Sequence, residues 1–186
     1  MIRTIIGGLV GGIVIFVIGM IFWATPLANI AVSGTDAQSA ANVQAVLAEA
    51  LTVHGTGVYM VPSPDTSAGT TLYGKGPVAL VQFNTSGFPA NGSDTMVPGI
   101  LLALATGMLI AAALRGTAGA LTDFRSRLQA VLCFSAAAVL WLHIGQPIFN
   151  HAPWGYYLYL AFSDFLSLAA AGTVIARWFV EGRPQP

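Results

Sequence analysis

Two residues could do chemistry inside an otherwise apolar part of the chain: His143 and Asp164. They lie in two long apolar runs, within residues 128–179, that are joined by a short polar segment at residues 145–153. A carboxylate in the middle of a membrane span costs roughly 2.5–3.5 kcal/mol on insertion scales, so Asp164 should face protein or water and have a partner. The candidate partner is His143, the histidine placed at membrane depth.

Two further polar residues accompany this pair. Gln146 follows His143 by three positions and Ser167 follows Asp164 by three, so each shares a helical face with its neighbour. At a rise of ~1.5 Å per residue, Asp164 lies about 9 Å deeper than His143, so direct contact needs helix tilt or a bridging water. We treat these four residues as a candidate polar tie within the membrane or a contact with a partner.

Three interpretations of the pair remain open. The first, which we favour, is a structural tie that holds the third and fourth helices together or holds a partner helix. The second is a proton or ion pathway, because histidine titrates near neutral pH and a buried aspartate can hold a proton. The third is haem ligation, which needs two histidines converging on one iron, whereas His151 lies in the turn and His54 in the outer segment.

The elements that carry these residues follow from composition. Hydrophobic residues make up 55% of the 186 positions and charged residues 8%, whereas a soluble domain carries about 25% charged residues. Several apolar runs approach the ~20 residues that cross a hydrocarbon core as a helix. We predict a mainly α-helical membrane protein with a small extracytoplasmic α+β segment between its first and second transmembrane helices. The four transmembrane helices are expected at residues 1–26, 96–115, 128–147 and 154–179.

Small residues at four-residue spacing mark packing faces on the first two of these helices. Such spacing lets helix backbones approach closely, which is how helices associate in lipid. The first span can pack against later spans of the same chain, which we favour, or against a separate subunit. The residues are Gly7, Gly8, Gly11 and Gly12 in the first span and Ala103, Gly107 and Ala111 in the second.

The outer segment, residues 27–95, is rich in Ser, Thr, Asn, Gly and Pro and is long enough for a small domain. A capping box that begins at Thr35 predicts a helix. Two strand-like runs follow, at residues 57–61 and 78–83, on either side of a turn-rich loop at residues 62–77. We predict a helix and an antiparallel strand pair whose core is too small to stand alone, so the segment leans on the membrane or on a partner.

The cations are distributed unevenly among the predicted loops. If the amino terminus is cytoplasmic, six of the seven Lys and Arg residues lie on the cytoplasmic side, and Lys75 alone lies outside. This agrees with the positive-inside rule. We therefore predict a multi-pass protein of a bacterial inner membrane, with cytoplasmic termini, a cytoplasmic tail at residues 180–186 and a periplasmic segment at residues 27–95. The six cations are Arg3, Arg115, Arg125, Arg127, Arg177 and Arg183.

The polar residues of the outer segment match no catalytic pattern. Their separations fit no metal-ligand spacing or catalytic triad, and the chain contains no GxSxG, HExxH, CxxC or P-loop sequence. We therefore expect no enzyme and no catalytic, cofactor-binding or metal-binding residues, although lipid or a quinone can contact the helices. We expect the lipid bilayer and other membrane subunits as partners, and no nucleic acid.

The order of elements resembles that of uncharacterised bacterial four-helix inner-membrane proteins. The resemblance rests on the arrangement of one anchor, an outer segment and three further spans, and on the runs GVYMVP (residues 57–62) and KGPVALVQF (residues 75–83). It implies the topology only.

We expect a non-catalytic accessory or structural subunit of a larger inner-membrane complex, of the respiratory or photosynthetic kind, that docks through its helices and its periplasmic domain. One alternative is a small proton- or ion-coupled transporter or channel that uses Asp164 and His143. Another is a membrane-bound binding module.

Overall fold

The computed structural model of the chain describes residues 1–90, 92 and 94–180. It is mainly helical, and four helices are long and apolar enough to cross a membrane. Three of them are single α-helices. The fourth, Phe124–Asn150, is assembled from α5 (Phe124–Val139), a π-helical turn (Leu140–Ile144) and α6 (Gly145–Asn150). Residues 181–186 of the expected cytoplasmic tail lie outside the described residues. The three single helices are α1 (Ile2–Trp23), α4 (Met96–Gly116) and α7 (Trp154–Trp178).

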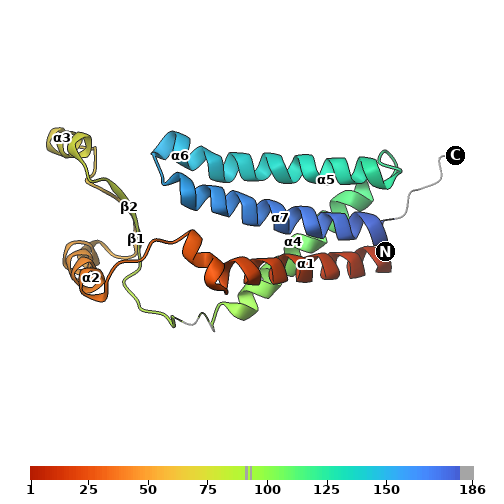
Figure 1. The fold of residues 1–186 in the computed structure, drawn as a ribbon, viewed down its shortest axis with the longest axis horizontal. Helices are drawn as coiled ribbons and strands as arrows, with labels where there is room; N and C mark the ends of the chain where they lie inside the picture. The colour runs from red at the N-terminus through yellow and green to blue at the C-terminus, as the bar shows by residue number, and fades with distance from the viewer. Residues whose placement is uncertain (91, 93, 181–186) are drawn as a thin grey trace. The chain divides into compact units, whose positions relative to one another are not determined.

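These helices form one bundle in which α1 and α7 are central. α1 packs most extensively on α4 and next on α7, while α5 packs on α7. α1 begins and α7 ends at the same end of the bundle (Figure 1), where Arg3 of α1 donates a hydrogen bond to the backbone carbonyl of Trp178 (3.1 Å). The chain therefore crosses the bundle an even number of times and returns to the end at which it started.

Two glycine faces of α1 position it against two different helices. A Cβ added at Gly12 would lie 2.5 Å from the Cα of Leu104 in α4, and one added at Gly11 would lie 2.5 Å from Cδ1 of Ile175 in α7. Gly107 of α4 in turn faces the backbone of Gly12. Close-packed interiors leave no room for an added carbon at such distances. The faces therefore pack within the chain's own bundle.

The other packing residues expected from the sequence are also buried against other helices of the bundle, and Ala111 packs in a cluster with Leu114, Val131 and Ile175. Gly8 faces Met108 of α4, and Gly7 faces Phe179 just beyond α7. The small residues buried on α4 are Ala103, Gly107 and Ala111. Because the chain's own helices fill these faces, they leave no groove into which the helix of a separate subunit could pack.

The third membrane helix begins earlier than the expected residue 128. The Asp123 side chain accepts a hydrogen bond from the backbone N–H of Ser126 (3.0 Å) and caps the first turn of α5 (Phe124–Val139). The helix thus starts where a capping residue is available rather than where the apolar run begins. As a consequence Arg127, expected in a cytoplasmic loop, lies within the helix and is buried.

The third membrane helix also ends later than expected. A π-helical turn (Leu140–Ile144) and α6 (Gly145–Asn150) continue it, so the segment expected as a polar turn is helical up to residue 150. Pro147 has no N–H, and its ring excludes an ordinary helical hydrogen bond to the carbonyl four residues earlier. The wider π-helical turn directly before it accommodates this missing bond without ending the helix.

Arginine side chains close the end of the bundle at which α1 begins. Arg127 is 6% exposed and donates hydrogen bonds to the backbone carbonyls of Ala176 (3.2 Å) and Val180. Arg3 donates to the carbonyl of Trp178. The last carbonyls of a helix have no intrahelical partners, and a nearby cation is also favoured by the helix dipole. Arginines from two other helices therefore satisfy the C-terminal end of α7.

Residues Gly34–Asn91 form a second compact unit, narrower than the expected segment of residues 27–95. It contains a two-stranded antiparallel sheet with Gly57 opposite Phe83, which confirms the expected strand pair. Its elements are α2 (Ala37–Leu51), β1 (Gly57–Val61), α3 (Ser67–Lys75) and β2 (Ala79–Phe83).

Two features of this unit differ from the sequence-based expectation. The residue that caps α2 is Asp36 rather than Thr35, because the Asp36 carboxylate accepts a hydrogen bond from the backbone N–H of Ser39 (2.9 Å). The loop expected at residues 62–77 contains α3, whose first turn is capped by the hydroxyl of Thr66. Helix capping by a threonine thus prevails over the turn-forming composition of this stretch.

Candidate functional site: a histidine–aspartate pair between two apolar helices

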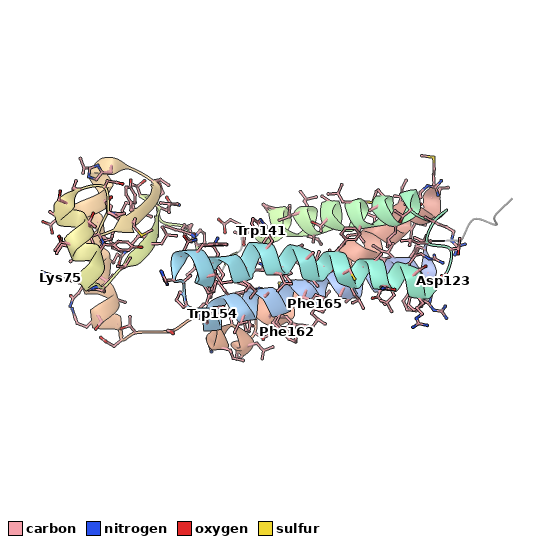
Figure 2. The ribbon with its side chains drawn as sticks, turned by 90° about the horizontal axis from the view of Figure 1, so that it is seen from above. Lys75, Asp123, Trp141, Trp154, Phe162 and Phe165 are labelled. Carbon is pink, nitrogen blue, oxygen red and sulfur yellow. The ribbon has the colours of Figure 1, made fainter. Side chains whose placement is uncertain are left out.

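The π-helical turn of the third membrane helix faces α7 and carries His143, while α7 carries Asp164. π-Helical turns occur mostly as single turns inside α-helices, often at functional sites. Trp154 and Asp123 mark the two ends of the bundle in Figure 2. Between them lie three aromatic residues that are within two positions of the pair in the sequence: Trp141, Phe162 and Phe165. The pair therefore lies within the length of the spans rather than at their ends.

The two side chains are in direct contact. His143 Nε2 lies 2.8 Å from Asp164 Oδ2, which is the distance of a hydrogen bond. The second carboxylate oxygen, Oδ1, lies 3.4 Å from Ser163 Oγ, whose hydroxyl is closer to the backbone carbonyl of Leu160 (3.1 Å). The His143 side chain is 16% exposed, whereas the Asp164 side chain is 47% exposed. Asp164 thus has a partner inside the bundle and also remains accessible from outside it.

The true end of the third helix explains why no bridging water is needed. That helix continues to Asn150, so His143 lies seven residues before its end, while Asp164 lies ten residues after the start of α7 at Trp154. At a rise of ~1.5 Å per residue, a difference of three residues is about 4.5 Å, which a histidine and an aspartate side chain together can span. The expected offset of about 9 Å assumed a helix end near residue 147, whereas the helix continues to Asn150.

Ser167 and Gln146, the other two members of the expected polar tie, do not join the pair. Ser167 Oγ donates to the backbone carbonyl of Ser163 (2.8 Å), and Gln146 accepts a hydrogen bond from the side chain of Asn150 (2.8 Å). Both bonds run along a single helix, so neither residue links two helices. The tie between the third helix and α7 at this depth therefore consists of His143 and Asp164.

Among the described residues, sequence reasoning missed three buried polar residues: Ser135, and two that contact the pair or the end of α7. Ser163 is 1% exposed and lies beside the Asp164 carboxylate; the signal that could have found it is its position directly before an intramembrane aspartate. Arg127 is the other, and nothing in the sequence separates it from Arg125, which is exposed. The fold alone decides which arginine reaches the end of α7.

A histidine and an aspartate in contact can pair their charges and exchange a proton. Among the described residues, no group of three or more His, Cys, Asp or Glu side chains could hold a metal ion. His151 follows α6 with a left-handed backbone conformation (φ 52°), and His54 belongs to the second unit. Neither histidine lies beside His143, so the described residues of this chain bring no second histidine to it for the haem interpretation.

Comparison of the chain with known proteins found no matching family model, no similar curated protein and no matching solved structure. The resemblance to bacterial four-helix inner-membrane proteins therefore stays a prediction.

Proposed function

We propose that this chain is a non-catalytic accessory subunit of a larger bacterial inner-membrane complex, anchored by its four helices and docked onto a partner protein through the unit Gly34–Asn91. The observation that carries this proposal is the missing core of that unit. Among its described residues, Gly69 alone is buried. A two-stranded sheet needs further strands or a packed helix to be stable in water, so a surface from elsewhere is required.

The apolar face of α2 provides the surface for such a partner. No residue of α2 is buried. Leu47 and Leu51 are half-buried, whereas Val43 and Val46, on the same face of the helix, are 58% and 64% exposed. An apolar helical face that the chain itself leaves uncovered is typical of a protein–protein contact. The partner proposed here is therefore a protein with an apolar surface outside the membrane.

The proposed orientation places this unit in the periplasm. Four arginines contact groups at the end of the bundle where α1 begins, and the positive-inside rule favours the cytoplasmic side for that end. The host complex, of the respiratory or photosynthetic kind, stays a prediction from the sequence. The arginines are Arg3, Arg115, Arg127 and Arg177.

Co-purification in a mild detergent tests the docking proposal. We expect the wild-type chain to purify with one protein at a fixed stoichiometry, and a Val43→Asp, Val46→Asp double variant to lose at least about nine-tenths of it, since each buried charge costs more than one factor of ten in affinity. The matched control is Ala45→Asp, which adds the same residue on the opposite side of α2 and should leave the ratio unchanged. A double variant with its partner at full stoichiometry, or a wild-type chain that purifies alone, would contradict the proposal.

A second candidate function is proton- or ion-coupled transport, which the direct contact between His143 and Asp164 favours. Ionisable residues within a span commonly mark a proton or ion pathway, and histidine titrates near neutral pH. Asp164→Asn keeps a hydrogen-bond acceptor for His143 but removes the carboxylate. If the chain transports protons, this variant, reconstituted into liposomes with a pH-sensitive dye inside, should lose the flux that the wild type shows. Equal flux from both proteins, or none from the wild type, would remove this candidate.

A further inference from the structure

Residues of α1 and α4, together with Met1, line an open pocket of about 380 Å³ at the arginine end of the bundle. The pocket is amphipathic, because a guanidinium and a hydroxyl line one part of it and aliphatic side chains line the rest. Its lining residues are Met1, Thr4, Ile5, Ala112, Arg115 and Gly116.

The cation in this pocket has unused hydrogen-bonding capacity. Among the described residues, Arg115 donates one hydrogen bond, to Thr4 Oγ1 at 3.4 Å, and no described carboxylate pairs with it. A guanidinium carries five N–H donors in a planar fork that matches the oxygens of a phosphate. Arg127, in contrast, already donates four hydrogen bonds to backbone carbonyls. Arg115 is therefore available to an anionic ligand in a way that Arg127 is not.

The surface next to the pocket is suited to hydrocarbon chains. Ile5 in the pocket is 46% exposed, and farther from the arginine end Leu9 of α1 and Leu109 of α4 are 41% and 72% exposed. These side chains belong to helices long and apolar enough to span a membrane, so lipid is their expected surrounding. A molecule with an anionic head at Arg115 and apolar tails along Leu9 and Leu109 would match both parts of this surface.

We propose that this pocket binds the phosphate headgroup of an anionic phospholipid, with Arg115 and Thr4 as its polar contacts and the acyl chains along α1 and α4. Basic pockets between transmembrane helices are a known way in which membrane proteins hold anionic lipids. A free phosphate ester would share the headgroup contacts but gain nothing from the apolar surface. The lipid is therefore the occupant that the whole pocket fits. This proposal goes beyond the accessory function and does not depend on it.

Native mass spectrometry of the purified full-length chain tests it. The protein is equilibrated in mixed micelles with equal amounts of phosphatidylglycerol and phosphatidylcholine, and the ratio of the two bound lipids is measured. We expect the wild type to prefer phosphatidylglycerol, and Arg115→Gln to lower the bound ratio about five-fold, the factor that one cation beside an anionic headgroup contributes. Arg125→Gln, which removes an exposed arginine outside the pocket, should leave the ratio unchanged, and Arg115→Lys should retain most of it.

Three controls make the outcome decisive. Thermal unfolding of each variant shows that it is folded, and Thr4→Val gives a second pocket variant that keeps side-chain size; we expect it to lower the ratio less than Arg115→Gln does. Soluble glycerol 3-phosphate, added at the concentration of the lipid, should not displace phosphatidylglycerol. Equal losses in the Arg115→Gln and Arg125→Gln proteins would show diffuse attraction instead of a site and overturn the proposal. Displacement by glycerol 3-phosphate would assign the pocket to a soluble phosphate ester and overturn it as well.

Discussion

His143 and Asp164 lie 2.8 Å apart between helices long and apolar enough to span a membrane, where water competes little for either side chain. Even so, the unfolded chain in a membrane also finds hydrogen-bond partners, so such contacts contribute about 0.6 kcal/mol on average and about 1.7 kcal/mol at most. Asp164 is half exposed, which places it within that range rather than above it. The contact is thus expected to fix how the third helix sits on α7 more than to stabilise the bundle as a whole.

A double-mutant cycle measures this contact directly. We expect His143→Ala and Asp164→Ala to destabilise the bundle with a coupling energy of about 0.6–1.7 kcal/mol, measured by reversible unfolding in bicelles. The control cycle pairs Asp164→Ala with Gln146→Ala. Since Gln146 bonds within its own helix, the control effects should add. A coupling energy near zero for the first cycle would mean that the contact does not form in the membrane.

The carboxyl of Asp36, which lies outside the spans, makes the stability of the first turn of α2 depend on pH. Hydrogen bonds from Ser39 hold the pKa of the Asp36 carboxyl below its usual range. A carboxylate with a lowered pKa stabilises the folded state at pH values above its unfolded pKa, and this stabilisation is lost as pH falls through the folded value. We therefore expect the first turn of α2 to fray below about pH 4, seen as loss of helical ¹³C chemical shifts at residues 37–40. Asp36→Asn, which caps without titrating, should abolish the pH dependence; a first turn equally helical at pH 2.5 and pH 6 in the wild type would contradict this role.

Among the helices, the α1–α4 interface depends on backbone contact rather than on large side chains. Gly12 and Gly107 face each other, and an added Cβ at Gly12 would meet the Cα of Leu104. Overpacking a tight interior costs about 1–3 kcal/mol, and more where the obstacle is backbone that cannot rotate away.

Substitution of two glycines of α1 tests this interface. We expect Gly12→Ile to lower the unfolding free energy of the bundle by at least about 3 kcal/mol. Gly19→Ile is the matched control, because nothing lies within 4 Å of a Cβ at Gly19, and it should be close to neutral. Unfolding in bicelles or resistance to a denaturing detergent distinguishes the two. Similar losses in both variants would show that helix propensity rather than close packing causes the effect.

The C-terminal end of α7 depends on Arg127. Replacing a buried hydrogen-bonding partner leaves carbonyls unsatisfied, each at a cost of about 1–3 kcal/mol. We therefore expect Arg127→Gln to destabilise the bundle by about 2 kcal/mol or more, with increased amide hydrogen exchange in the last turn of α7. The exposed Arg125 gives the control, Arg125→Gln, which should change neither quantity. Equal effects of the two substitutions would mean that only net charge at this end matters.

Across the whole molecule, the spans could be predicted from hydropathy because each membrane helix must be apolar along its length whatever it packs against. The partners of those helices could not. The glycine spacing indicates packing faces on α1, but only the fold shows that Gly8 and Gly12 face α4 while Gly7 and Gly11 face α7. Which helix a glycine contacts depends on the arrangement of the other helices, and the spacing of glycines within one helix does not determine that arrangement.

The candidate site shows the same limit. Both residues of the pair could be identified, because an aspartate and a histidine stand out among apolar neighbours. Their contact could not be, because it depends on a π-helical turn before Pro147 and on a helix that continues to Asn150. A proline among polar residues resembles a turn, and only tertiary packing can keep such a segment helical.

At the largest scale, the described residues of the unit Gly34–Asn91 form no core beyond the buried Gly69, so we expect the unit to take its stability from a partner protein. The most direct test is hydrogen–deuterium exchange of α2 and the β1–β2 pair in three settings: native membrane vesicles, and the chain produced in a host that lacks the partner and then purified into lipid nanodiscs or into detergent. We expect strong protection in native vesicles and at least about ten-fold faster exchange in both purified preparations, because the partner is missing from them. Equal protection in nanodiscs and native vesicles would show that the chain and lipid suffice, and it would contradict the docking of this unit onto another protein.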